Sequence, residues 1–126
     1  MTVTNERETG RLISSEKVEG TSVENPQGEN LGVIRDLMID KISGEVAYAV
    51  LKYGSFLGMG GKLFALPWDV LEYDTQRSAY IIDLPEDQLR GAPSYPEDTQ
   101  PNWSDPAWNR SVYNYYGADA SRFSQF

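Results

Sequence analysis

The chain has 126 residues, of which 19 are acidic and 11 basic, and it contains neither cysteine nor histidine. The resulting formal charge of −8 disfavours direct binding to nucleic acid or to an anionic membrane surface. The missing residue types exclude disulfides, thiolate nucleophiles, imidazole acid–base chemistry and zinc sites. A metal would need oxygen ligands alone, and we predict no cofactor.

The length suits one domain, which at this size buries roughly two-thirds of its unfolded surface. No apolar run approaches the ~20 residues that cross a bilayer, and the polar start of the chain is unlike a signal peptide. We therefore expect a soluble, cytoplasmic protein without a membrane span. Residues 1–13 are polar and lack periodicity, which predicts a mobile leader.

The β domain is expected to begin at residue 14. Ser14 or Ser15 can cap one helical turn that runs through Lys17, and a first short strand is predicted at residues 20–23. A turn rich in Asn, Pro and Gly follows at residues 25–30.

The longest expected strand runs from residue 31 to 41 and is partly apolar on both faces. Alternation divides it into Leu31, Val33, Leu37 and Ile39 on one face, and Ile34, Asp36, Met38 and Asp40 on the other. Such a strand is curved into a barrel or covered on both sides. A helix is the alternative, but Gly32 and the turn from Asp40 to Gly44 favour a hairpin with an antiparallel strand at residues 45–53.

Three glycines, Gly58, Gly60 and Gly61, precede the next expected strand at residues 62–66. Because glycine accepts positive φ and close backbone contact, this glycine loop permits a sharp reversal, and Pro67 ends the hydrogen-bond ladder. A phosphate-binding loop is the alternative, but no helix follows and the motif spacing is absent.

Two more strands are predicted at residues 71–74 and 79–83, after a bend at 67–70 and joined by a turn at 75–78. About six short strands with regular turns are typical of a small barrel or sandwich.

The order of these segments resembles the PRC-barrel family, which is named after the H subunit of the photosynthetic reaction centre. The family also includes the C-terminal domain of a bacterial ribosome-maturation factor. The resemblance covers residues 14–84 and rests on the strand with Asp36 and Asp40, the strand that follows Gly44, and the glycine loop ahead of Leu66-Pro67-Trp68. It implies a small, strongly bent, all-β antiparallel barrel that acts as an interaction or scaffold module and shares no catalytic residue. We expect neither the transmembrane segment of the reaction-centre subunit nor the N-terminal domain of the ribosome factor.

Residues 85–126 differ in composition and predict an extension with short helices. A short helix fits residues 84–91, and four prolines predict an extended stretch over residues 92–106. Asp105 and Pro106 can then start a helix that Gly117 ends. We call residues 92–126 the aromatic arm.

The aromatic arm carries more aromatic side chains than it can bury by itself. They include Trp103, Trp108, Tyr113, Tyr115, Tyr116, Phe123 and Phe126, and Trp108, Val112, Tyr115 and Tyr116 share one face of the expected helix. Exposed aromatic patches usually mark contact surfaces. The arm could dock back on its own barrel and cover an open edge, cross to a second subunit in a homodimer, or bind another protein.

Carboxylates offer little chemistry. Asp36 and Asp40 lie four apart on a strand, hence about 13 Å from each other, which exceeds the separation in glycosidase pairs. We expect Asp40 to accept backbone hydrogen bonds in the following turn and Asp36 to pair with a base. Glu72, Asp74 and Asp83 could form a weak divalent-ion site, for which solvated strand ends are the simpler interpretation. No serine has a histidine to activate it, so we predict no enzyme activity and no catalytic residue.

These observations predict a non-enzymatic scaffold or adaptor that self-associates, with a homodimer as the expected state and an unidentified protein partner as a further possibility. The predicted assembly residues of the arm are Trp103, Trp108, Val112, Tyr115, Tyr116 and Phe123. The predicted contact residues around the glycine loop are Phe56, Leu57, Met59 and Trp68, for which core packing is the alternative. The predicted structural turn positions are Asp36, Asp40, Gly44, Gly58, Gly60, Gly61 and Pro67. Two other functions stay open: an RNA-processing or ribosome-associated module acting through a basic protein, and a small-ligand binder at the barrel mouth.

Overall fold

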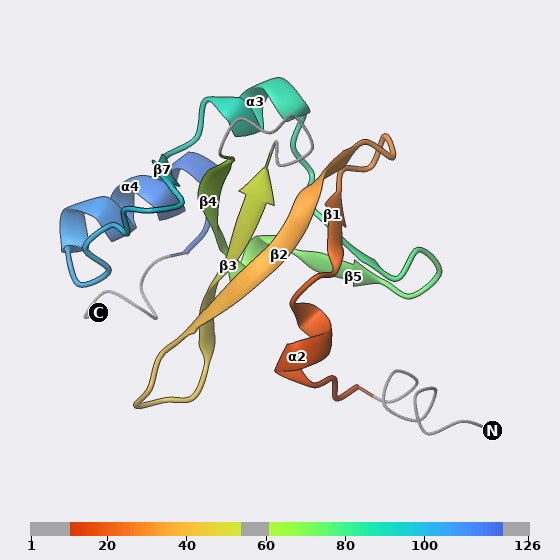
Figure 1. The fold of residues 1–126 in the computed structure, drawn as a ribbon, viewed down its shortest axis with the longest axis horizontal. Coiled ribbons are helices and arrows are strands. Elements are labelled where there is room, and N and C mark those ends of the chain that lie inside the picture. Colours follow the sequence, from red (N-terminus) through yellow and green to blue (C-terminus); the bar gives the residue numbers. More distant parts are fainter. Residues whose placement is uncertain (1–10, 54–60, 120–126) are drawn as a thin grey trace.

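The computed structural model describes residues 11–53 and 61–119. Strands in this part of the chain form one seven-stranded sheet in the order β5-β6-β1-β2-β3-β4-β7 (Figure 1). The strands are β1 (Ser22–Glu24), β2 (Asn30–Ile39), β3 (Val46–Tyr53), β4 (Lys62–Pro67), β5 (Glu72–Asp74), β6 (Ala79–Ile81) and β7 (Ser94–Pro96). The helices are α2 (Ser15–Val18), the 3-10 helix η2 (Trp68–Val70), α3 (Glu86–Arg90) and α4 (Pro106–Tyr116).

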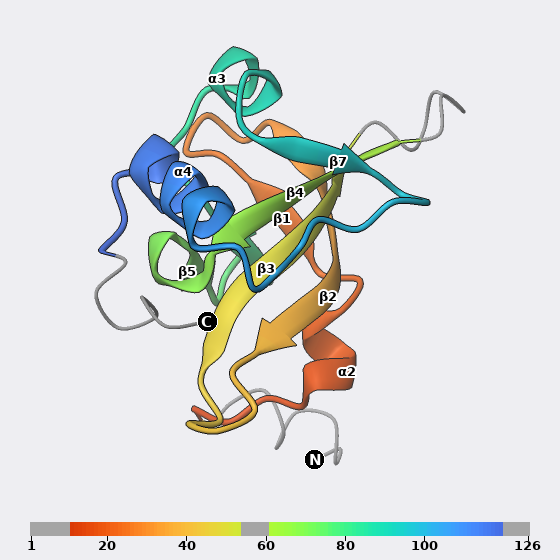
Figure 2. The ribbon, with the colours of Figure 1, turned by 90° about the vertical axis from the view of Figure 1, so that its left-hand side faces the viewer.

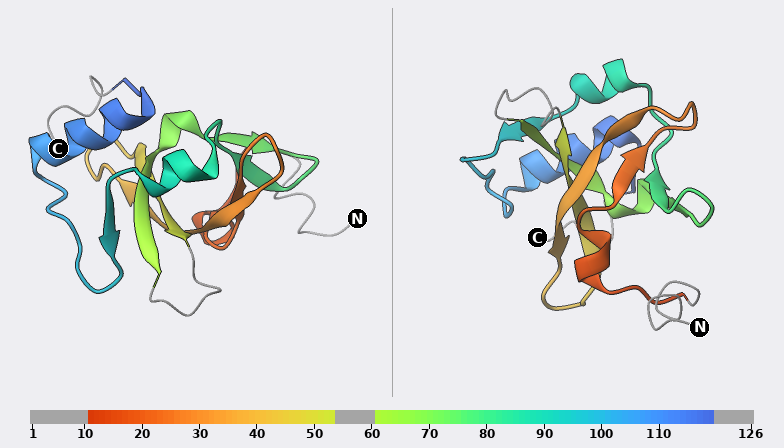
Figure 3. Two further views of the ribbon diagram at one scale, coloured as in Figure 1. Left: turned by 90° about the horizontal axis from the view of Figure 1, so that it is seen from above. Right: turned by 45° about the vertical axis from the view of Figure 1, so that its right-hand side comes forward.

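The sheet is strongly bent but open (Figures 1 and 3). Neighbouring strands pair antiparallel except β1 and β6, which are parallel. The predicted mostly-β fold is therefore confirmed, whereas the closed antiparallel barrel is not, because the edge strands β5 and β7 do not pair with each other. Side chains from β1, β2, β3, β4 and β6 instead meet in one core inside the bend. That core also takes in Val18, Leu89 and Ala92, so it continues past residue 84.

The predicted alternation along β2 is wrong. Leu31 and Ile34 were expected on opposite faces, yet both are buried in the same core. The pairing with β1 shifts between Val23 and Glu24, opposite Leu31, and such a bulge changes which face the following side chains join. A second shift, in the pairing with β3 between Ile34 and Asp36, acts on the residues after it. Gly32 lies beside the first bulge with a φ of +146°, and a Cβ there would lie 2.2 Å from the carbonyl oxygen of Lys52. Only glycine fits this position.

The alternation of β3, in contrast, is confirmed at its centre. Ala49 and Leu51 belong to the core inside the bend, while Tyr48 and Val50 pack in two clusters on the other face. A strand that is apolar on both faces must be covered on both faces. The second cover comes from the aromatic arm, whose helix α4 lies across this side of the sheet (Figure 2).

The predicted helices begin and end at the residues that cap them. The side chain of Ser14 accepts a hydrogen bond from the Lys17 amide at the start of α2. At α4 the Asp105 carboxylate accepts one from the Ala107 amide, and Gly117 closes the helix with a φ of +68°.

The stretch predicted to be extended over residues 92–106 contains a strand that was not predicted, because residues 94–96 add β7 to the sheet beside β4. Proline is tolerated at this position because an edge strand leaves one row of amides outside the ladder.

Candidate interaction surface

The described part of the aromatic arm docks on its own sheet. Val112 and Tyr113 are fully buried against Ala47, Tyr48 and Ala65. The centroid of the Trp103 ring lies 5.7 Å from that of Tyr48 and 5.3 Å from that of Trp108, in tilted and edge-on arrangements that favour aromatic packing. The arm thus covers the outer face of β3 and β4 within one chain.

Asn109 of α4 holds this arm in place through buried hydrogen bonds. Its side-chain amide donates to the carbonyl oxygens of Trp103, at 2.9 Å, and Asp105, at 3.0 Å. The Tyr48 hydroxyl donates to Asn109 Oδ1, and the Tyr113 hydroxyl donates to the Ala47 carbonyl at 3.1 Å. Sequence reasoning missed Asn109, although a buried-face asparagine inside a predicted helix is a signal, because asparagine favours helix ends over helix interiors.

The predicted assembly residues fall into different environments. Val112 is fully buried, and Tyr116 packs between the inner and outer clusters. Trp103 and Trp108 are half-buried. Tyr115 is 41% exposed, and its hydroxyl donates to the Gln88 carbonyl at 2.5 Å. Of the three possibilities for the arm, docking on its own chain is the one that this arrangement displays. Phe123 lies outside the described residues.

The glycine-loop predictions are only partly visible. Phe56, Leu57, Gly58, Met59 and Gly60 lie outside the described residues.

Three positions around the glycine loop are described. Trp68 is half-buried against the inner core, with its ring 5.4 Å from that of Tyr80, so core packing accounts for it. A Cβ at Gly61 would lie 2.8 Å from the Tyr53 carbonyl oxygen, and Pro67 is the last residue of β4, as expected for structural positions.

The carboxylate pair is not brought together as a site. Asp40 Oδ1 accepts hydrogen bonds from the amides of Ile42, at 3.0 Å, and Ser43, at 3.5 Å. These bonds, the Ile42 one first, lower the pKa of Asp40, while Gly44 supports the same turn with a φ of +80°. Asp36 lies 3.9 Å from Arg35, on an exposed stretch of β2. Asp40 therefore holds the turn, whereas Asp36 lies inside β2 and is not a turn residue.

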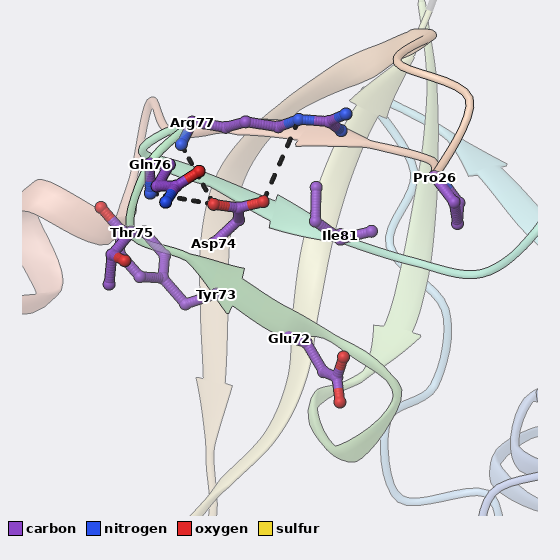
Figure 4. Close-up of a pocket in the computed structure, with 8 residues that line it drawn as sticks. All are labelled: Pro26, Glu72, Tyr73, Asp74, Thr75, Gln76, Arg77 and Ile81. Atoms are coloured by element: carbon purple, nitrogen blue, oxygen red, sulfur yellow. Dashed lines mark hydrogen bonds and ion pairs between the residues drawn. The ribbon is translucent and has the colours of Figure 1, made fainter.

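A polar surface hollow of about 590 Å³ lies beside the β5–β6 hairpin (Figure 4). The Asp74 carboxylate accepts hydrogen bonds from the amides of Gln76 and Arg77, and the Arg77 side chain pairs with Glu24 at 3.4 Å. These polar groups are engaged with one another. Among the described residues, no three acidic side chains lie close enough together to hold a metal ion.

A second hollow, of about 370 Å³, lies between the β2–β3 turn and the aromatic arm. We call it the hairpin groove; it is lined by Met38, Ile39, Asp40, Lys41, Ile42, Ala47, Tyr48, Trp103 and Ser104. Ile42 is 92% exposed and Ile39 is 52% exposed. Sequence reasoning missed this groove because Trp103 is far away in the chain, although an isoleucine inside a predicted turn is an unusual choice that could have indicated it.

A small, bent, open sheet whose outer face is covered by its own C-terminal segment is the class of domain that these observations define. The family model of the PRC-barrel domain matches residues 11–89, which is more than half of the chain. The chain belongs to the PRC-barrel family. No curated protein matches it. Within the described residues, no helix has the length and apolar character needed to cross a membrane.

Two tyrosines of α4 whose hydroxyl groups are buried allow a paired stability test. Tyr116 Oη is buried without a hydrogen-bond partner in the described part of the chain, whereas the Tyr113 hydroxyl reaches the Ala47 carbonyl. We expect Tyr116→Phe to raise the free energy of unfolding by up to about 1 kcal/mol and Tyr113→Phe to lower it by about 1 kcal/mol. Urea unfolding of the two variants checks this, and a loss of stability in Tyr116→Phe would contradict it.

Alkaline pH should unfold the protein through these tyrosines. Burial raises the pKa of Tyr95 to about 12, with Asp36 adding to the shift, and burial also raises the pKa of Tyr48, Tyr113 and Tyr116. Folding favours their neutral forms, so this stabilisation is complete below about pH 10, where an unfolded tyrosine titrates, and is lost as pH rises towards about 12. The urea midpoint should fall over this window, and less steeply in Tyr95→Phe. A urea midpoint that stays constant up to about pH 12 would contradict this prediction.

Proposed function

We propose that the chain is a non-enzymatic protein-interaction module, an adaptor or scaffold, and that the hairpin groove is its contact surface. The observation that carries the proposal is the exposure of Ile42 and Ile39 beside the apolar side chains of Met38, Tyr48 and Trp103. Water around such a cluster favours its burial by another apolar surface.

The rigidity of the groove supports the same function. One wall is the β2–β3 hairpin, and the other is Trp103, whose carbonyl is held by Asn109 while its ring packs on Tyr48. A preformed hollow of this kind loses little conformational entropy when it binds.

Two polar groups at the groove have structural tasks, which supports a module without catalysis. The carboxylate of Asp40 holds the turn, and the hydroxyl of Tyr48 donates to Asn109. The formal charge of −8 also favours a protein partner over nucleic acid.

Site-specific photo-cross-linking tests the proposal. A benzophenone amino acid in place of Ile42, in the full chain and in the cells that produce it naturally, is expected to give a cross-linked protein adduct. The matched control places the same group at Thr75, an exposed position in the turn between β5 and β6. An adduct pattern identical at the two positions, or no adduct at position 42, would contradict the proposal.

A further inference from the structure

The β2–β3 hairpin carries both halves of an apolar contact. Ile42 projects from the turn, and the hollow beside it is walled by apolar side chains, among them Met38, Tyr48 and Trp103. In a two-fold interface the same patch meets itself, so each copy must present both a protruding group and a matching hollow. We infer that the occupant of the hairpin groove is Ile42 of a second copy of this chain, with the two hairpins related by a two-fold axis. This inference rests on the proposed function and names its partner.

The turn carries charges of both signs, so two copies of it can attract each other. Lys41 lines the groove beside Asp40, and Glu45 follows on the other side of the turn. When two such turns meet in reversed orientation, Lys41 of one copy faces acidic side chains of the other, which fixes the register of the pair. A hairpin that carried charges of one sign alone would repel a second copy of itself.

The position of the turn separates the two acidic bodies. The β2–β3 turn lies at the tip of its hairpin, at the bottom of Figures 1 and 2 and on the side away from α3. Exposed charges farther apart than about 8 Å are largely screened at physiological salt. Two copies can therefore join through their turns although each carries a formal charge of −8.

The contact is small, so the dimer should be weak. Interfaces at the low end of the size range are typical of transient association, and we expect a dissociation constant of about 10 to 500 µM. Such an interface depends on one central apolar side chain in each copy, because binding energy concentrates at the best-buried contact.

Sedimentation equilibrium of the full chain, from about 5 µM to about 1 mM, tests the inference. The chain is expected to form a dimer, and Ile42→Asp is expected to weaken dimerisation by about a hundredfold or more, because both copies lose their buried group. Thr75→Asp, the matched charge change in the β5–β6 turn, should leave the dimer unchanged. Urea unfolding of each variant verifies that it is folded.

The geometry of the pair is tested with single cysteines, since the chain has none of its own. Ile42 lines the groove into which the second copy's Ile42 enters, so Ile42→Cys should form an intermolecular disulfide under mild oxidation, and Thr75→Cys should not. A chain that stays monomeric to about 1 mM, a dimer that Ile42→Asp leaves intact, or equal disulfide formation at both positions would overturn the inference.

The photo-cross-linking experiment distinguishes a failure of the dimer inference from a failure of the proposed function. If the chain is monomeric but position 42 cross-links a different protein, the groove binds a partner. Only the inference that this partner is a second copy of the chain is then wrong. If the chain is monomeric and position 42 gives no adduct, both are wrong.

Discussion

Replacing Gly32 by alanine is expected to lower the free energy of unfolding by about 4 kcal/mol or more. A Cβ at this position would lie 2.2 Å from the Lys52 carbonyl oxygen, which belongs to the neighbouring strand and cannot move without breaking the β2–β3 ladder. The φ of +146° adds backbone strain for any residue with a side chain. Urea unfolding measures the loss. We expect much of the variant to be unfolded already in the absence of urea.

Gly28→Ala is the control for the strain that a positive φ causes by itself. Gly28 also has a positive φ, +86°, but nothing lies within 4 Å of the Cβ that would be added. We expect this change to cost only about 1 to 2 kcal/mol. Equal losses in the two variants would mean that the contact with Lys52 has no energetic weight.

The second large effect is expected at Asn109. Asn109→Ala removes the acceptor of the Tyr48 hydroxyl and the donor to the carbonyls of Trp103 and Asp105, all on the buried side of α4. Breaking these side-chain hydrogen bonds in a buried setting should lower the free energy of unfolding by about 3 kcal/mol. Because the same bonds position Trp103, the tryptophan fluorescence should also shift towards that of exposed tryptophan before the sheet unfolds.

Asn114→Ala is the matched control, since Asn114 is exposed on the same helix. It should leave stability unchanged or raise it by about 0.5 kcal/mol, as alanine is the better helix former. If Asn109→Ala behaves like Asn114→Ala, the buried hydrogen bonds do not hold the arm.

Local patterns predicted most secondary-structure elements of this chain. Ser14, Asp105 and Gly117 act as caps where the sequence places them, and the glycine turn at residues 40–44 closes the β2–β3 hairpin. These features depend on neighbours within four residues, so the sequence contains all the groups involved.

Three features of the fold depend on contacts between distant residues and were not predictable in this way. The bulges at Leu31 and after Ile34 arise only when β2 pairs with β1 and β3, and they change the expected faces. The addition of β7 to β4 and the parallel pairing of β1 with β6 join segments whose local sequence does not encode a partner.

The sequence by itself determined the mostly-β class, the family resemblance, the helix ends and the need to cover many C-terminal aromatic side chains. Only the tertiary structure decided that Val112, Tyr113 and Asn109 cover the chain's own sheet, that the sheet stays open, and that Trp103 and Ile42 share one groove. The physical reason is that burial and hydrogen bonding between residues 60 or more apart, such as Tyr48 with Asn109, depend on how the whole chain packs. Local propensity carries no information about such pairs.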